Sequence, residues 1–296
     1  MRLFAVLVCS SFVGWTAVAA AAPPAKGAEP PAPETPMQVY LVRSAQAGCE
    51  PQCPEWIAAQ GKIDADSVRL FRKALSLLGK RKVPVLVDSG GGKVREALEI
   101  GRLVRGKGLD VAVTRTVITP CAPADAACRK ARMGGALLGL PQAHLSKCAS
   151  SCAFILAAGT RRLVGPRTLV GVHRIRSFYV YSRVLRTYRY TSSRKRLVSE
   201  RRIARKVVET RTSQQTYDQI GRYFGAMGIG DPIMPLILST PSDRLHWLTR
   251  DELRASRLAT DWIDGEEFLG KAAISSVQPI PGPHGDSPGG ATVPPE

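Results

Sequence analysis

The sequence predicts an α/β fold in which parallel strands alternate with helices. Short runs with apolar residues at 56–63, 83–88 and 110–114, the last two rich in Val, are typical of strands. The two segments between these runs place apolar residues at helical spacing. Those residues are Val68, Phe71, Leu75 and Leu78 in the first segment and Val94, Ala97, Leu98 and Val104 in the second. Strand, helix, strand, helix and strand is the order of parallel βαβ units.

Local signals set the expected ends of these elements. Asp64 or Asp66 is expected to cap the first helix, and a glycine turn at 89–92 leads into the second. Further along, Tyr217, Ile220 and Phe224 indicate another helix. Thr249 and Glu252 have the spacing of a capping box for a last helix, and residues 262–263 are expected to close the sheet.

Composition divides the chain into a central domain with two tails. Residues 1–22 have the charged start, apolar middle and small-residue exit of a cleaved signal peptide, which predicts a periplasmic or secreted protein. A membrane anchor is the alternative, but the apolar run is short and interrupted. Residues 23–37 form a Pro/Ala-rich linker and residues 278–296 a Pro/Gly-rich disordered tail. The domain is expected at 38–277.

Cysteine usage fits export. Of the seven cysteines, one lies in the predicted signal peptide, which leaves six in the mature chain. An even number in an oxidising compartment favours disulfides, although six cysteines allow 15 connectivities. A zinc site is the alternative, and the spacings do not match a zinc finger. The six cysteines cluster as three local pairs: Cys49 and Cys53, Cys121 and Cys128, and Cys148 and Cys152.

The candidate site centres on Ser150. Small residues and two hydroxyls precede an apolar run at 152–158, which predicts a tight turn into a buried helix whose free N–H groups can hold an anion. His173 follows a short apolar strand and would serve as general base if the fold brings it to the serine. The alternative is a turn whose small residues serve only packing.

A second set of backbone donors is expected at the glycine turn 89–92. Glycines after a strand let backbone N–H groups approach an oxyanion, and a tetrahedral intermediate needs such donors. The alternatives are a flexible connector and a phosphate loop. A phosphate loop is disfavoured because the Lys-Ser/Thr ending is absent.

Three blocks resemble ClpP-type serine peptidases. VDSGGGKV at 87–94, ASSCAFILAAG at 149–159 and PRTLVGVH at 166–173 are similar, in order and spacing, to the family's Ser-Pro-Gly-Gly, Ala-Ser-Met-Gly-Ala and Pro-to-His blocks. The likeness runs from about 56 to 264 and is greatest to exported periplasmic relatives. It implies a ClpP/crotonase spiral of ββα units, a peptide or protein substrate, and no metal or cofactor.

The resemblance also implies roles for individual residues. Ser150 would be the nucleophile and His173 the base, and the N–H groups of Gly91 and Ser151 would form the oxyanion hole. The family's third residue, an Asp, falls at Leu245 in this sequence, so Asp243, two positions earlier, is the nominated orienting carboxylate. Other departures are the Gly that replaces the proline of the first block and Cys152, which replaces a Gly.

A basic arm follows His173. Residues 174–211 hold thirteen Arg or Lys and two Glu, a net charge of +11 within a chain of net charge +18. Aromatic residues alternate with the cations in its first half and predict a hairpin. Ile203, Val207 and Val208 predict a helix in the second half, so that 174–230 forms a hairpin and helical arm.

Two functions are therefore expected. The first is an exported ClpP-like serine hydrolase, a peptidase. The alternative is a catalytically inactive protein of the same fold that binds an anionic envelope partner, lipid or cell-wall polymer, through its arm. Self-association into a homo-oligomer is the other use of such an arm in ClpP-like proteins, whereas nucleic acid is disfavoured because no nucleic-acid-binding motif accompanies the charge.

Overall fold

A computed structural model describes residues 35–120 and 135–275, and it confirms the α/β class. Strands β2 (Glu55–Gln60), β3 (Val85–Asp88) and β4 (Val111–Val113) pair in parallel in that order. Helices α1 (Ser67–Leu78) and α2 (Val94–Lys107) connect them. The predicted run of βαβ units is therefore present.

The sheet extends beyond these strands on both sides. In the described residues its order is β5-β6-β1-β2-β3-β4-β8. The added strands are β1 (Gln38–Ser44), β5 (Arg115–Ile118), β6 (Leu137–Gln142) and β8 (Arg162–Leu163). The sequence placed the first strand at 56–63, so β1, which pairs antiparallel with β2, was not predicted.

A smaller sheet carries the candidate site. It consists of β7 (Ser146–Ala149), β9 (Thr168–Val172) and β12 (His246–Trp247), in the order β12-β9-β7. Strands β7 and β9 are parallel, whereas β12 is antiparallel to β9. A single bridge between Ser89 and Cys148 connects this sheet to the residue that follows β3.

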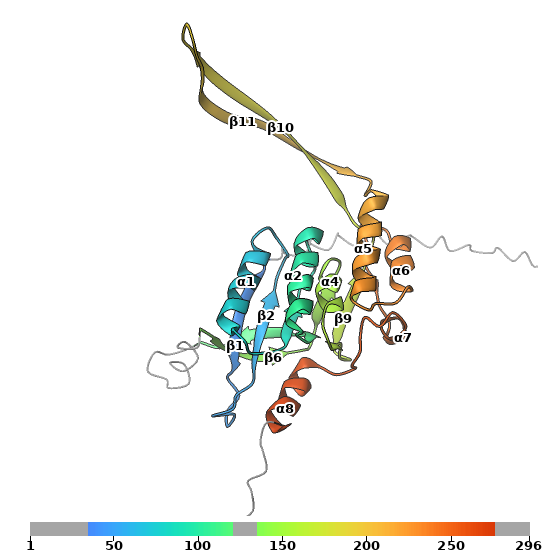
Figure 1. The fold of residues 1–296 in the computed structure, drawn as a ribbon. Coiled ribbons are helices and arrows are strands. Elements are labelled where there is room, and N and C mark those ends of the chain that lie inside the picture. Colours follow the sequence, from blue (N-terminus) through green and yellow to red (C-terminus); the bar gives the residue numbers. More distant parts are fainter. Residues whose placement is uncertain (1–34, 121–134, 276–296) are drawn as a thin grey trace, which may run out of the picture. The chain divides into compact units, whose positions relative to one another are not determined.

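Helices α1, α2 and α4 (Cys152–Ala157) lie side by side, and α5 (Gln214–Ala226) follows them (Figure 1). The contact between α2, α4 and α5 is close. The Tyr223 hydroxyl donates a hydrogen bond of 2.6 Å to the Phe154 carbonyl and lies where a Cβ at Gly101 would clash with it. This packing buries the inner face of α4, which begins directly after the Ser150 turn.

The C-terminal part adds α6 (Ile233–Ser239), α7 (Arg250–Ala255) and α8 (Gly265–Ser275). The predicted capping box at the start of α7 is confirmed, with Thr249 and Glu252 bonded reciprocally. The closing strand predicted at 262–263 is not formed, and only a single bridge joins Leu163 to Asp261.

At the start of α1, Asp66 occupies the N-cap position without a side-chain cap bond. The Asp64 carboxylate instead accepts hydrogen bonds from the backbone N–H groups of Asp66 and Ser67, at 3.0 and 3.1 Å. Of the two candidates, Asp64 therefore satisfies the free N–H groups that a helix start leaves exposed.

The basic arm is a β-hairpin, and the helix predicted for its second half is wrong. Strand β10 (Ser177–Tyr190) pairs antiparallel with β11 (Lys195–Thr210) along its length, and these two strands form their own sheet. Figure 1 shows them as a long two-stranded ribbon. The spacing of Ile203 and Val207 suits a helix, but β-branched residues favour strands, and pairing with β10 satisfies the backbone.

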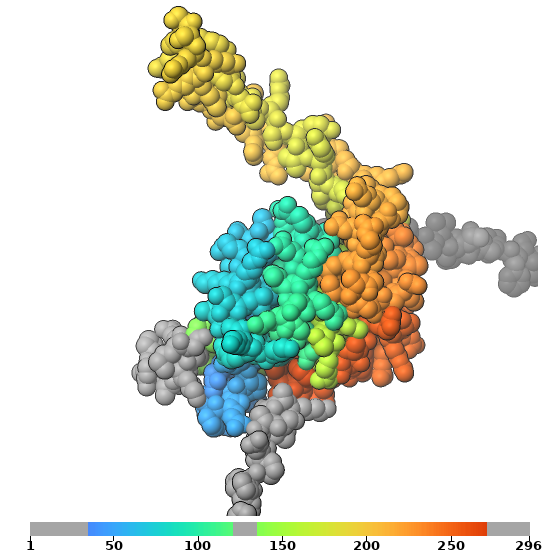
Figure 2. Space-filling view, viewed as in Figure 1, coloured from blue at the N-terminus to red at the C-terminus, as the bar shows by residue number. Residues whose placement is uncertain are grey.

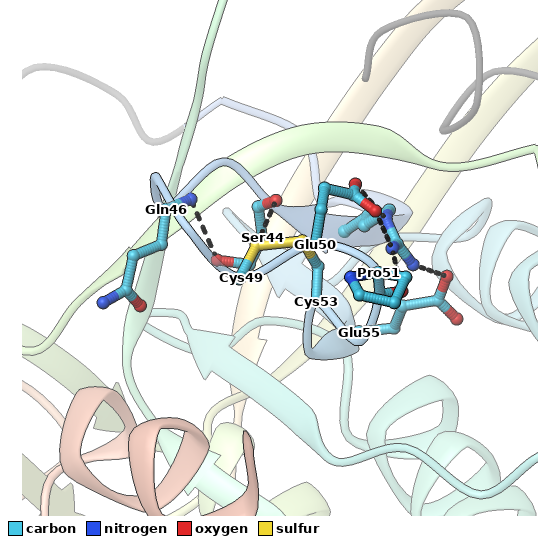
Figure 3. Close-up of a disulfide and its surroundings, with 8 residues drawn as sticks. Ser44, Gln46, Cys49, Glu50, Pro51, Cys53 and Glu55 are labelled. Carbon is cyan, nitrogen blue, oxygen red and sulfur yellow. Dashed lines mark hydrogen bonds and ion pairs between the residues drawn. A yellow bond between two sulfur atoms is a disulfide. The ribbon is translucent and has the colours of Figure 1, made fainter. Parts of the chain in front are cut away.

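A disulfide between Cys49 and Cys53 closes the loop between β1 and β2 (Figure 3). Arg43 reinforces this loop through ion pairs with Glu50 and Glu55, at 3.1 and 3.5 Å. The predicted signal peptide and C-terminal tail lie outside the described residues, as do Cys121 and Cys128. Among the described helices, none has the length and apolar character that crossing a membrane requires.

Candidate functional site

Ser150 sits at a sharp turn between strand β7 and helix α4. Its φ is +57°, in the left-handed region that a residue with a side chain rarely adopts. That conformation costs about 1–2 kcal/mol relative to ordinary backbone. Strain of this kind persists where the surrounding structure enforces it, and it concentrates at functional sites. The side chain is half-buried, whereas that of Ser151 is fully buried.

A disulfide encloses the turn. Cys148 lies in β7 and Cys152 is the first residue of α4, and the structure joins them with a Cα–Cα distance of 5.2 Å. Both cysteines are fully buried. Because the bridge spans the two residues between strand and helix, it holds Ser150 and Ser151 between two fixed points.

The glycine turn after β3 packs directly against the serine. Gly91 has φ +103°, and a Cβ placed there would lie 2.7 Å from the Ser150 Cβ and 3.1 Å from the Ser151 nitrogen. Only glycine fits this contact. Ser89 fixes the turn, since its N–H donates to the Lys147 carbonyl at 2.8 Å.

The two N–H groups expected to form the oxyanion hole differ in whether they already donate a hydrogen bond. The Gly91 N–H donates to the Ser89 hydroxyl at 3.1 Å, and that hydroxyl donates to the Gly61 carbonyl at 2.6 Å. The Ser151 N–H has no hydrogen-bond acceptor within the part of the chain that the structure describes. The Ser151 N–H is therefore free to donate to an oxyanion. The Gly91 N–H could donate to the same oxyanion only after its hydrogen bond to the Ser89 hydroxyl breaks.

His173 comes to the same sheet edge as Ser150. The Ser150 N–H donates to the Gly171 carbonyl at 2.8 Å, so the serine continues the parallel pairing of β7 with β9. His173 directly follows β9, and the carboxyl ends of neighbouring parallel strands lie at one edge. Along the described chain no hydrogen bond joins the Ser150 hydroxyl to the imidazole.

Burial favours the neutral form of the His173 imidazole. Burial lowers its pKa from the ordinary value of 6.5; the Arg174 backbone opposes this effect, and the charge of Arg176 reinforces it. Its Nδ1 atom is buried and has no hydrogen-bond partner. A neutral ring can accept a proton at pH 7, but in the described residues no carboxylate is bonded to Nδ1 of this one.

The structure does not bring Asp243 to His173. Asp243 is exposed, and its charge acts on Arg176 and Glu209. Strand β12 pairs His246 with Val172, and one further step of that register aligns Leu245 with His173. In the described ranges no carboxylate contacts the imidazole.

Two features of β12 were not predicted. His246 contacts Glu252 through Nε2 and Oε1 at 2.9 Å. The Trp247 ring packs against Gly171 so closely that a Cβ added to Gly171 would lie 2.7 Å from the ring. Burial raises the pKa of Glu252, but its bonds with Thr249 and His246 outweigh this effect and leave the pKa lowered. The only sequence signal for this pair was the capping box, which identified Glu252 without its histidine.

The described residues contain no group of His, Cys, Asp or Glu side chains arranged to hold a metal ion. The arrangement consists instead of a strained serine, two backbone N–H groups and a neutral histidine at one sheet edge. Acyl transfer uses groups of these kinds together with a carboxylate, and in the described residues no carboxylate contacts the imidazole.

Comparison with known proteins gives structural neighbours only. No family model and no curated protein matches the chain. A mutant of the 1510-N membrane-bound stomatin-specific protease is similar with 14% identity and a TM-score of 0.41, covering 72% of this chain and 81% of that one. ClpP1 from Listeria monocytogenes is similar with 14% identity and a TM-score of 0.39, covering 70% and 90%. A mutant of that ClpP1 gives 13% identity, a TM-score of 0.41, and coverage of 72% and 94%.

Proposed function

We propose that this chain is a ClpP-like serine hydrolase that cleaves peptide bonds, with Ser150 as nucleophile and His173 as general base. The observation that carries the proposal is the left-handed conformation of Ser150 at a strand-to-helix turn against Gly91. A turn of this kind exposes a hydroxyl beside backbone N–H groups, which is the arrangement that acyl transfer requires.

In this mechanism His173 takes the proton from the Ser150 hydroxyl as the oxygen attacks a substrate carbonyl. The Ser151 N–H, and that of Gly91 after Ser89 moves away, would stabilise the negative oxygen of the intermediate. His173 then gives this proton to the leaving amine as the C–N bond breaks. A water molecule, deprotonated by His173, attacks the acyl-serine, and His173 returns the proton to the Ser150 oxygen as the acid product leaves. Loss of the orienting carboxylate from a comparable triad lowers turnover by about 10⁴, so hydrolysis is expected to be slow.

We also propose that the protein is exported to the periplasm or secreted. The supporting observations are the signal-peptide pattern at 1–22 and the two disulfides at Cys49–Cys53 and Cys148–Cys152. Disulfides form and persist in oxidising compartments and are rare in the cytosol.

The Asp243 role remains a prediction without structural support.

The catalytic proposal is tested by the rate of reaction with a fluorophosphonate probe. Ser150→Ala is expected to abolish labelling, and His173→Ala to slow it by at least about a hundredfold. The wild-type rate should rise with pH with a midpoint below 6.5, because the pKa of His173 is lowered and only the neutral ring accepts a proton. Ser151→Ala is the matched control, since it keeps its backbone N–H. Equal labelling of the wild type and Ser150→Ala would contradict the proposal.

The disulfide across the turn should matter for reactivity as well as stability. Replacing both Cys148 and Cys152 with Ser is expected to lower the free energy of unfolding by about 2 kcal/mol, the value for so short a loop, and to slow probe labelling. Replacing Cys49 and Cys53, which are also four residues apart, is the control. The Cys49 and Cys53 variant should lose a similar free energy of unfolding in denaturant titration and keep the wild-type labelling rate. If labelling slows equally in both variants, the Cys148–Cys152 disulfide has no special effect on Ser150.

A second function is favoured by one observation, the buried Nδ1 of His173 without a partner. A base whose Nδ1 is bonded to no carboxylate fits a catalytically inactive protein of this fold, which would act by binding an anionic envelope partner through the basic arm. Absence of probe labelling in folded, disulfide-bonded protein, in every oligomeric state isolated, would favour this function over hydrolysis.

A further inference from the structure

The β10–β11 hairpin exposes apolar side chains on both of its faces. No described element covers this ribbon in the view of Figure 2. The exposed fractions range from 39% at Val184 to 69% at Tyr190. The exposed large apolar residues of the hairpin are Phe178, Tyr179, Val180, Tyr181, Val184, Leu185, Tyr190, Leu197, Val198, Ile203 and Val207. So many exposed apolar residues on one element indicate a contact site for a partner.

The same hairpin carries a large unneutralised charge. Residues 177–210 include ten Arg or Lys and two Glu, a net charge of +8. Each Glu already forms an ion pair with an Arg, Glu200 with Arg186 and Glu209 with Arg176. Within the described chain, nine hairpin cations have no ion pair: Arg183, Arg189, Arg194, Lys195, Arg196, Arg201, Arg202, Arg205 and Lys206.

We infer that this hairpin binds the surface of an anionic lipid bilayer, with its cations on headgroup phosphates and its apolar side chains among the headgroups and upper acyl chains. Cations alone would suit any polyanion. A dissolved polymer, however, offers no apolar region for the eleven exposed apolar side chains, whereas a bilayer interface accommodates both kinds of contact and favours Tyr in particular.

The hairpin is expected to lie at the interface and not to cross the bilayer. Two strands alone leave backbone groups unpaired along both outer edges, which is costly in hydrocarbon. Cations also lie on both faces: Lys206 is paired with Tyr181 on one rung, and Arg202 with Val184 on a rung of the other face. A hairpin that lies at the depth of the headgroups can reach phosphates with its cations and acyl carbons with its apolar side chains, and water there can bond its backbone edges.

The tip combines the two kinds of contact most closely. Residues 191–194 form the turn, and Tyr190 and Lys195 make the last rung. The Lys195 ammonium lies 4.0 Å from the centre of the Tyr188 ring. Arg194 and Arg196 flank it without ion pairs in the described structure. We therefore place the first lipid contact at the tip.

The inference deepens the binding function above and does not depend on catalysis by Ser150. The experiment uses the full chain with vesicles of phosphatidylglycerol and phosphatidylcholine, measured by co-sedimentation. Converting Arg194, Lys195 and Arg196 to Gln should lower partitioning about a hundredfold, because each cation near an anionic surface contributes about fivefold. Raising the salt should also weaken wild-type binding, since the Debye length is about 10 Å at 0.1 M.

Matched variants separate the alternatives. Converting Lys73, Lys80 and Arg222 to Gln removes the same charge from positions outside the hairpin and should leave partitioning nearly unchanged. Tyr190→Ser with Val198→Ser should weaken vesicle binding several-fold and leave binding to soluble dextran sulfate unchanged. Three results would overturn the inference: wild-type vesicle binding by that serine variant, wild-type binding to dextran sulfate without binding to vesicles, or a tip variant that changes oligomer mass alone.

Discussion

Leu245→Asp is expected to raise the rate at which Ser150 reacts with a fluorophosphonate by roughly two to four orders of magnitude. The β12–β9 register aligns position 245 with His173, whose buried Nδ1 has no partner. A carboxylate there would orient the ring and stabilise its charged form, an effect worth about 10⁴ in turnover in a comparable triad. Leu245 is 38% exposed, so the substitution does not bury a charge in the core. The measurement is the second-order labelling rate.

Two controls decide the interpretation of that result. Leu245→Asn has similar size and no charge, and it should give a much smaller gain. Asp243→Asn should leave the rate unchanged, because the Asp243 charge acts on Arg176 and Glu209 and not on the imidazole. A large loss of rate in Asp243→Asn would instead restore Asp243 as the orienting residue.

Gly91→Ala is expected to destabilise the protein by about 3 kcal/mol or more and to abolish probe labelling. Its Cβ would lie 2.7 Å from the Ser150 Cβ and 2.8 Å from the Ala149 carbonyl oxygen, and φ +103° is strained for any residue with a side chain. The Ser150 turn would have to move. Denaturant titration measures the first effect and the labelling rate the second.

Gly106→Ala is the matched control for that substitution. Gly106 lies in α2, and a Cβ added to it would meet no atom within 4 Å, so alanine should stabilise the helix by about 0.5–1 kcal/mol. Labelling should be unaffected. A Gly91→Ala protein that keeps both wild-type stability and labelling would show that the contact with Ser150 is not required.

The fold was predictable where local pattern and final environment agree. Val85 and Val111 lie in buried strands, and the apolar stripe of α1 at Val68, Phe71 and Leu78 faces the core, so the central βαβ run followed from residue spacing. The second half of the arm did not follow, because the positions of Ile203 and Val207 suit either a helix or a strand. Pairing with β10, a contact between distant residues, decided it.

The site was predictable in its chemistry and less so in its geometry. A serine among small residues before an apolar helix indicated the turn, and Gly91 indicated the close approach that the structure contains. The family's blocks placed the carboxylate position at Leu245, which the β12–β9 register aligns with His173, but sequence spacing could not show that Asp243, two residues earlier, leaves the imidazole without a carboxylate. Nor could it show that the Gly91 N–H is bonded to Ser89, a contact set by side-chain rotation.

The most direct test of the central claim is to identify the residue that a fluorophosphonate modifies in the wild-type, disulfide-bonded protein. Digestion and tandem mass spectrometry of the labelled chain would locate the adduct. The proposed function predicts one phosphonate, on the Ser150 hydroxyl, that forms at least about a hundredfold more slowly in His173→Ala. An adduct on Ser151 or elsewhere, or an unmodified chain after prolonged exposure, would contradict it.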